Sequence, residues 1–138
     1  MQTFLPYSDF RMCAHVLDRP RLGKQRIEAK QIAKTLSAKE PKGWRNHPAV
    51  KMWSPYRNHL LHYGLAICYE WRDRGYKDKQ LFWFMKELDY RINPDHMRWP
   101  GDQQIHSTHR AALLYKNPEH YIQFGWSEKP ELNYFWPV

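Results

Sequence analysis

The chain has 138 residues, of which 42% are hydrophobic and 16% aromatic, and its formal net charge at pH 7 is +8. This length suits one compact domain, and this hydrophobic content excludes a disordered chain. No stretch approaches about 18 consecutive apolar residues, so we expect no membrane-spanning helix. The start, MQTFLPYSDFRM, has no basic region followed by an apolar run, so no secretory signal is expected. Two cysteines are too few for a disulfide framework, which favours a reduced, cytoplasmic setting.

The positive charge is concentrated in the first part of the sequence. Of the 22 Lys and Arg residues, 12 lie in residues 1–60, against only 4 of the 14 Asp and Glu residues, so the whole excess of +8 lies there. A polyanion such as nucleic acid is the natural partner of so asymmetric a basic surface. The alternative is a basic protein whose charge serves solubility alone, although solubility requires no such asymmetry.

The sequence predicts two helices near its start. The first should run from Ser8, as N-cap, to Val16. Asp18 is expected to cap the second, which has Pro20 in its first turn and runs to about Ala38. The residues that repeat at helical spacing and form its buried stripe are Leu22, Ala29, Ile32, Ala33 and Leu36.

Two more helices are predicted in the middle of the chain. The sequence Asn46-His47-Pro48 indicates the start of a helix, with Asn46 as its expected cap. The most strongly patterned helix should follow Ser54 and Pro55 and end at Gly75. Its predicted buried face consists of Tyr56, Leu60, Tyr63, Ile67 and Trp71.

The second half continues with short helices. Asp78 can cap a helix that runs to about Tyr90, and because Phe82 and Trp83 lie off its apolar face, we expect burial on more than one side. Residues 91–101 are predicted to form a loop. Helices are then expected at about 103–116 and 119–124, and an aromatic tail over residues 133–138 should pack on the core.

No segment alternates between apolar and polar residues with period two. No repeats, low-complexity tracts or linkers rich in Gly and Ser interrupt the chain. We therefore expect an all-α fold, a compact single-domain helical bundle that covers residues 1–138.

One acid stands out in the stretch LDRPRLGKQRIEAKQ, residues 17–31. After Asp18, Glu28 is the only carboxylate among five cations. On a helical wheel it lies roughly 90° from the centre of the buried stripe, at the border where a side chain can face a groove. One interpretation is a surface pair with Lys24, which is one turn earlier. The other is functional: cations keep Glu28 ionised beside a bound phosphate backbone, where it can stabilise a developing cation or accept a proton.

Four segments, in this order and spacing, carry a resemblance to a known family: LDRPRLGKQRIEA, NHPAV, YGLAICYEWRDRGY and HRAALLYKNPEHY. Together they span residues 17–121 and are similar to the pyrimidine dimer DNA glycosylases of the endonuclease V type. The resemblance implies a compact all-α enzyme that excises damaged bases from DNA without a metal. It also implies that Glu28 is the catalytic glutamate, since this position matches the family's.

The resemblance further implies how the sugar is attacked. In that family an N-terminal α-amine attacks the sugar C1′ and gives an imine, which then eliminates and nicks the strand. The best-known members expose a small hydroxylated residue after losing methionine, whereas this chain begins Met1-Gln2 and should keep Met1. Three nucleophiles therefore stay open: the amine of Met1, the amine of Lys24, or water.

Several cations and histidines are candidates for contact with DNA. His109 and Arg110 share a helical face with His106, which suits contact with phosphate or bases but equally suits polar side chains satisfied within the fold. No CxxC or HExxH motif is present, so we expect no metal and no other cofactor. The candidate DNA-binding residues are Arg19, Arg21, Arg26, Arg45, His47, His109, Arg110 and Lys116.

The resulting hypothesis is a DNA repair glycosylase with AP lyase activity that excises a damaged or modified pyrimidine through an amine-derived imine. Its partner would be double-stranded DNA. We expect a monomer in the cytoplasm or associated with the nucleoid. Two alternatives are a monofunctional glycosylase for a modified base, as would serve conflict between phage and host, and a DNA-binding module without catalysis.

Overall fold

The computed structural model describes residues 1–38, 43–92 and 102–138. Helices are the only regular secondary structure in these ranges, which confirms the predicted all-α fold. In chain order the elements are α1 (Phe10–Val16), α2 (Arg19–Ser37), η1 (Trp44–Asn46), α3 (Pro48–Trp53), η2 (Ser54–Tyr56), α4 (Arg57–Asp73), α5 (Leu81–Glu87), α6 (Asp102–Lys116), α7 (Pro118–Tyr121) and η4 (Ile122–Phe124).

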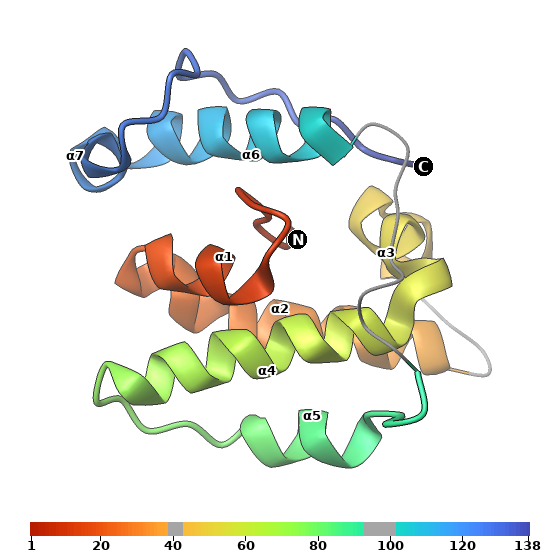
Figure 1. Cartoon of the computed structure of the whole chain (residues 1–138). Helices are drawn as coiled ribbons and strands as arrows, with labels where there is room; N and C mark the ends of the chain where they lie inside the picture. The colour runs from red at the N-terminus through yellow and green to blue at the C-terminus, as the bar shows by residue number, and fades with distance from the viewer. Residues whose placement is uncertain (39–42, 93–101) are drawn as a thin grey trace.

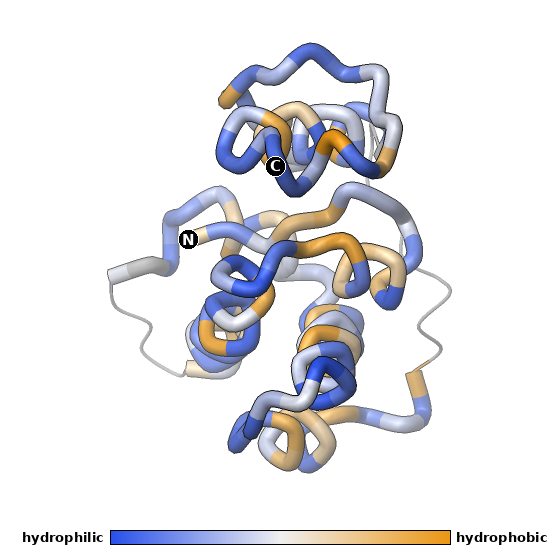
Figure 2. Tube along the Cα trace, turned by 90° about the vertical axis from the view of Figure 1, so that its left-hand side faces the viewer, coloured by the Kyte–Doolittle hydropathy of each residue, from blue (hydrophilic) through white to orange (hydrophobic). Residues whose placement is uncertain are grey.

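The helices lie in layers around the start of the chain. The long helices α2 and α4 pack against each other, and α1 and α5 both pack on α4. Residues 1–6, which we call the N-terminal segment, lie between these helices and α6 (Figure 1). Seen from the side, α6 and the tail again lie beyond the N-terminal segment (Figure 2). The start of the chain is therefore enclosed by elements from both halves of the sequence.

The predicted buried stripes of α2 and α4 are confirmed, except that Leu36, Tyr56 and Trp71 pack only partly against the core. Both stripes face the core at helical spacing, as an amphipathic pattern requires. Close approach of α5 to α4 depends on Gly64, because a Cβ at this position would lie 2.3 Å from Cε1 of Phe84. The fully buried residues of the two stripes are Leu22, Ala29, Ile32 and Ala33 on α2, and Leu60, Tyr63 and Ile67 on α4.

Two helix starts differ from the prediction. Asp9, not Ser8, caps α1, because its Oδ1 accepts two backbone N–H groups of the first turn. His47, not Asn46, caps α3, because its Nδ1 accepts a backbone N–H there. In both cases the true cap is the polar residue one position later. The end of α4 is as predicted, since Gly75 follows it with a φ of 92°.

Helix α5 is shorter than the Asp78–Tyr90 span predicted for it. The Asp78 carboxylate does accept the N–H of Leu81, at 2.8 Å. Phe82, however, is 72% exposed, so the expectation that this helix is buried on more than one side is wrong. Trp83 packs only partly against the core. The predicted loop falls largely on residues 93–101, outside the described ranges.

The aromatic tail packs on the core as predicted, through Tyr134, Phe135 and Trp136. Hydrophobic and hydrophilic residues are interspersed along the helices (Figure 2). Within the described part of the chain, no helix combines the length and the apolar character needed to cross a bilayer.

Candidate active site

The N-terminal segment, residues 1–6, is non-helical, and residues 2–6 are buried. A buried segment outside a helix or sheet needs other partners for its backbone groups. Helix α6 supplies two of them. The N–H of Leu5 donates to Nδ1 of His109 at 2.8 Å, and the Leu5 carbonyl oxygen lies 2.7 Å from Nδ1 of His106. These histidines therefore hold the start of the chain against α6.

Gln25 holds the same segment from α2. Its Oε1 accepts the N–H of Phe4 at 3.0 Å and the hydroxyl of Tyr63 at 2.7 Å. Its Nε2 donates to the carbonyl oxygen of Gln2 at 2.8 Å and to Oε2 of Glu28 at 3.0 Å. Gln25 is 1% exposed, so this amide is buried with its full hydrogen-bonding capacity used. It ties the start of the chain to the candidate catalytic carboxylate.

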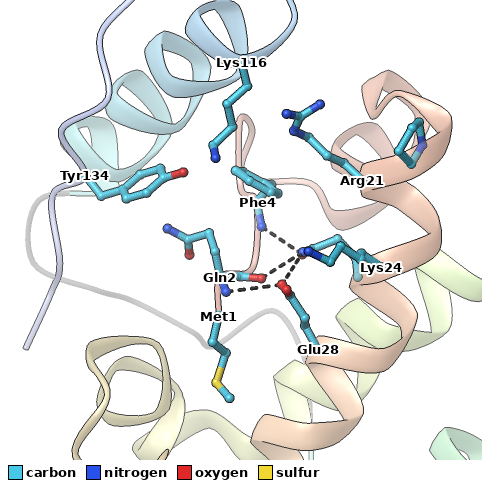
Figure 3. Close-up of a pocket in the computed structure, with 10 residues that line it drawn as sticks. Met1, Gln2, Phe4, Arg21, Lys24, Glu28, Lys116 and Tyr134 are labelled. Atoms are coloured by element: carbon cyan, nitrogen blue, oxygen red, sulfur yellow. Dashed lines mark hydrogen bonds between the residues drawn. The ribbon is translucent and has the colours of Figure 1, made fainter.

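Glu28 lies directly beside the start of the chain (Figure 3). Its Oε2 accepts the backbone N–H of Gln2 at 3.2 Å, in addition to the bond from Gln25. The α-amino nitrogen of Met1 is joined to that Gln2 nitrogen through only one Cα and one carbonyl carbon. Among the described residues Glu28 forms no ion pair with Lys24, so the alternative of a simple surface pair is not what the structure contains.

A pocket of about 450 Å³ opens beside Glu28. Its volume is within the roughly 300–1,000 Å³ typical of small-molecule sites. Its walls come from α2, the N-terminal segment, the end of α6 and the tail (Figure 3). Of the described residues that line it, Glu28 is the one acid, so an anionic ligand would be attracted to the rest of the rim. The other lining residues on which we rely are the cations Arg21, Lys24 and Lys116 and the aromatic residues Phe4 and Tyr134.

Asp18 positions one of these cations. Its Oδ2 accepts a hydrogen bond from Nη1 of Arg21 at 2.9 Å, and its Oδ1 accepts one from the hydroxyl of Tyr121. Burial, together with the hydrogen bond to Asp18, raises the pKa of Tyr121, so this hydroxyl stays protonated. Asp18 therefore starts α2 by position but uses its carboxylate for these bonds and not as a side-chain cap. This fixes α7 to the start of α2 and directs Arg21 along the pocket rim.

His47 lies near the amino group of Met1. Its Nδ1 accepts the N–H of Ala49 at 3.0 Å, and its ring meets that of Trp136 edge-on, with centroids 6.0 Å apart. The pKa of His47 is lowered, chiefly by burial and next by the positive charge of the Met1 amino group, whereas Glu28 acts in the opposite direction. His47, the amino group and Glu28 therefore lie within electrostatic range of one another.

Two of the predicted DNA-binding arginines are used inside the fold. Nη1 of Arg26 lies 2.6 Å from Oδ1 of Asp78, and its guanidinium stacks over the ring of Trp71 at 4.6 Å. Nη2 of Arg110 pairs with Glu128 at 2.7 Å. Both guanidinium groups are paired with carboxylates, as that of Arg21 is, but neither residue is among the described ones that line the pocket. We therefore leave both out of the DNA contacts proposed below.

His109 is fully buried, and burial lowers its pKa to about 3, so the ring is neutral in the folded protein. We leave it out of the proposed contacts because it holds Leu5 and presents no surface. Arg19 and Arg45 are exposed, the former with its guanidinium 4.8 Å from the ring centroid of Tyr76. Both remain available at the surface.

Sequence reasoning missed several residues of this site. Gln25 carried a usable signal, since it stands three residues after Leu22 and four before Ala29 in the buried stripe, where a polar side chain needs a partner. Gln2 and Tyr134 carried none, because neither the N-terminal segment nor the tail has a periodic pattern that reports what it packs against. Within the described residues no cluster of His, Cys, Asp or Glu could hold a metal ion.

Comparison with known families identifies one that matches this chain. A model described as pyrimidine dimer DNA glycosylase matches residues 1–84, more than half of the chain. The chain belongs to this family. No curated protein and no solved structure matches it significantly. Membership in the pyrimidine dimer DNA glycosylase family supports a DNA glycosylase function with DNA as the substrate.

The matched residues contain most of the site but not all of it. The N-terminal segment and Glu28 lie within residues 1–84, whereas Lys116 and Tyr134 lie beyond them. The pocket of this glycosylase family member is therefore completed by a part of the chain that the family model does not match.

Proposed function

We propose that this protein is a DNA glycosylase with AP lyase activity that excises a damaged or modified pyrimidine from double-stranded DNA. The observation that carries the proposal is the hydrogen bond of 3.2 Å from the Gln2 backbone to Glu28. It holds the residue after Met1 against the carboxylate, and Met1 and Glu28 both line the pocket that cations rim. A nucleophile and a carboxylate side by side are what imine-forming base excision requires.

In the proposed reaction, the nitrogen of Met1 bonds to C1′ of the deoxyribose while the bond from C1′ to the base breaks. The bonding electron pair leaves with the base, which takes up a proton. An α-amine has an ordinary pKa of about 8, so part of such a group is neutral and nucleophilic near pH 7. Glu28 would stabilise the positive charge that develops on the sugar and accept a proton from the attacking amine.

Strand cleavage follows from the same intermediate. The proton held by Glu28 would pass to the ring oxygen O4′, which opens the sugar and leaves an imine between C1′ and the amine. Loss of a proton from C2′ then expels the 3′ phosphate by β-elimination. Lys24, which lines the same pocket and has no hydrogen bond or ion pair within the described residues, is the second candidate for the amine.

The phosphate backbone would be held by cations around the pocket. Arg21, Lys24 and Lys116 rim it directly. The exposed Arg19 and Arg45, and the ring of His47, are further candidates for phosphate contact. Contacts of this kind position the duplex without reading its sequence. Holding a bent duplex with one nucleotide extruded would bring C1′ to Glu28.

The test is reductive trapping on duplexes that each contain one pyrimidine dimer or one modified pyrimidine. Borohydride should attach the protein covalently to the DNA, and peptide mapping should locate the attachment at Met1. Attachment at Lys24 would show that the side-chain amine of Lys24 is the nucleophile. Base release without trapping would support a monofunctional glycosylase, and binding without release would support a module that lacks catalysis.

A matched pair of extended proteins sharpens this test. Two residues added before Met1 should abolish trapping, because they replace the α-amine with an amide beside Glu28. The same two residues added after Val138, which is 71% exposed, should leave trapping unchanged. Intact mass measurement of the untagged protein confirms which amine is present. Equal trapping by both extended proteins would exclude the Met1 amine.

A further inference from the structure

The side chain of Gln2 takes no part in the reaction proposed above. Gln2 is only 7% exposed, and among the described residues its Nε2 has no partner at normal hydrogen-bond distance and angle. Its Oε1 accepts the backbone N–H of Thr3 at 2.8 Å. Because a backbone N–H can only donate, this bond fixes the orientation of the amide and leaves the NH₂ group on the other side.

That NH₂ group points into the pocket. Figure 3 shows the Gln2 side chain directed away from Glu28, toward Tyr134 and Lys116. Burial raises the pKa of Tyr134 to about 12, and the Gln2 amide acts against this rise. The two side chains are thus near enough for a weak hydrogen bond, but Nε2 has no partner at normal hydrogen-bond distance and angle. A buried donor without a partner in a native fold needs an explanation, and a ligand is one.

Gln2 also lies at a fixed position relative to the reaction centre. Its backbone N–H donates to Glu28, while its side chain reaches the pocket wall opposite. A sugar whose C1′ lies at Glu28 would therefore direct its attached base toward the Gln2 amide. The rings of Phe4 and Tyr134, with centroids 6.4 Å apart, add apolar surface beside that space.

We propose that the Gln2 carboxamide is a catalytic residue that donates a hydrogen bond to O2 of the pyrimidine being excised. This inference rests on the proposed function. Every pyrimidine nucleotide carries a carbonyl group at C2, next to the N1 that bonds to the sugar, whereas a purine has no carbonyl next to its glycosidic nitrogen. An amide N–H at this position would favour pyrimidines as the substrate class.

The same hydrogen bond assists the chemistry. When the bond between C1′ and N1 breaks, its electron pair moves onto the base and spreads from N1 to O2. A donor already in place, in a site shielded from water, is worth most where negative charge develops. Gln2 transfers no proton in this step. The base takes its proton from solvent, and Met1 supplies the new bond to C1′.

The experiment compares two substrates for two variants. Gln2→Met removes the donor at similar volume, and Gln2→Glu keeps the acceptor for Thr3 but replaces the donor. Gln123→Met, on the exposed surface, is the matched control. Single-turnover excision of a pyrimidine lesion should fall by about 10–100-fold in both Gln2 variants. Borohydride trapping on a duplex with a preformed abasic site, which has no base to stabilise, should stay unchanged.

A series of pyrimidine substrates that differ in the stability of the departing N1 anion provides a further test. A purely structural role of Gln2 would give the same defect across this series. The defect of Gln2→Met should shrink for pyrimidines whose N1 anion is more stable, since they need less help from a donor. Equal losses on lesion and abasic substrates would show that Gln2 only shapes the site, and normal excision by either variant would show that the donor does nothing. If the unmodified protein neither releases a base nor traps, the proposed function itself fails, and this inference fails with it.

Discussion

The two sides of α2 carry the same kinds of side chains but use them differently. On the side that faces α4 and α5, Arg26 pairs with Asp78, and Lys30 donates to Gln80 at 2.9 Å. On the pocket side, Lys24 has no such partner within the described residues, and Glu28 is bonded to the start of the chain. One side thus uses its charges to assemble helices, whereas on the other Lys24 stays unpaired within the described residues, although Arg21 is held by Asp18. The sequence shows that α2 is rich in cations but does not show which of them are paired.

The largest effect that we expect concerns Glu28, the carboxylate on the pocket side of α2. Glu28→Gln should reduce base excision by at least about 100-fold, because the variant cannot stabilise positive charge on the sugar. DNA binding should stay the same or become tighter, since a negative charge near phosphate is removed. Single-turnover excision and a binding titration measure these outcomes, with Glu87→Gln on α5 as control. Normal turnover by Glu28→Gln would remove the catalytic assignment.

Asp78, the carboxylate that pairs with Arg26 on the other side of α2, should affect the stability of the fold. The Asp78 side chain is fully buried, so Asp78→Asn leaves the charge of Arg26 uncompensated and should lower the free energy of unfolding by about 3 kcal/mol. Chemical denaturation measures this loss. At temperatures where the variant is folded, its excision rate should be near normal. A variant that is stable but inactive would contradict the division of α2 into two sides.

The third prediction concerns the histidine that holds the N-terminal segment. Because burial lowers the pKa of His109 from 6.5 to about 3, the unfolded chain binds a proton below pH 6.5 that the folded chain does not. Stability is therefore fully present above pH 6.5 and falls as the pH decreases toward 3, by about 2 kcal/mol at pH 5. Denaturation at pH 7 and pH 5 tests this. His109→Asn should lose most of the difference between the two pH values.

The smallest predicted effect compares two lysines of the same helix. Lys24→Gln should weaken DNA binding a few-fold and reduce the slope of log affinity against log salt by about one unit, because one phosphate contact is lost. Lys30→Gln should leave that slope unchanged, since its amine is bonded to Gln80 and lies 5.3 Å from the ring of Trp83. Equal slopes for the two variants would show that the sides do not differ in DNA contact.

The sequence allowed the helices to be predicted, because they depend on periodicity, whereas the catalytic role of Glu28 followed from the family resemblance and stays a prediction. The stripe of α2 placed Glu28 at the border of the core, where the structure has it. Periodicity shows which side of a helix is buried but not what covers that side. It therefore could not show that Arg26 meets Asp78, or that His109 is turned inward to accept the N–H of Leu5.

The site is built from residues that lie far apart in the sequence, and this has a consequence for folding during synthesis on the ribosome. Leu5 emerges well before its partner His109, which is 104 positions later. Helices α2 and α4 can pair as soon as they leave the exit tunnel, since domains begin to fold from the N-terminal side during translation. The opening residues must then wait for α6 before they are enclosed. Nascent chains halted before α6 should contain the acid and several of its cations but no finished cavity, so competence for repair should be acquired only late in translation.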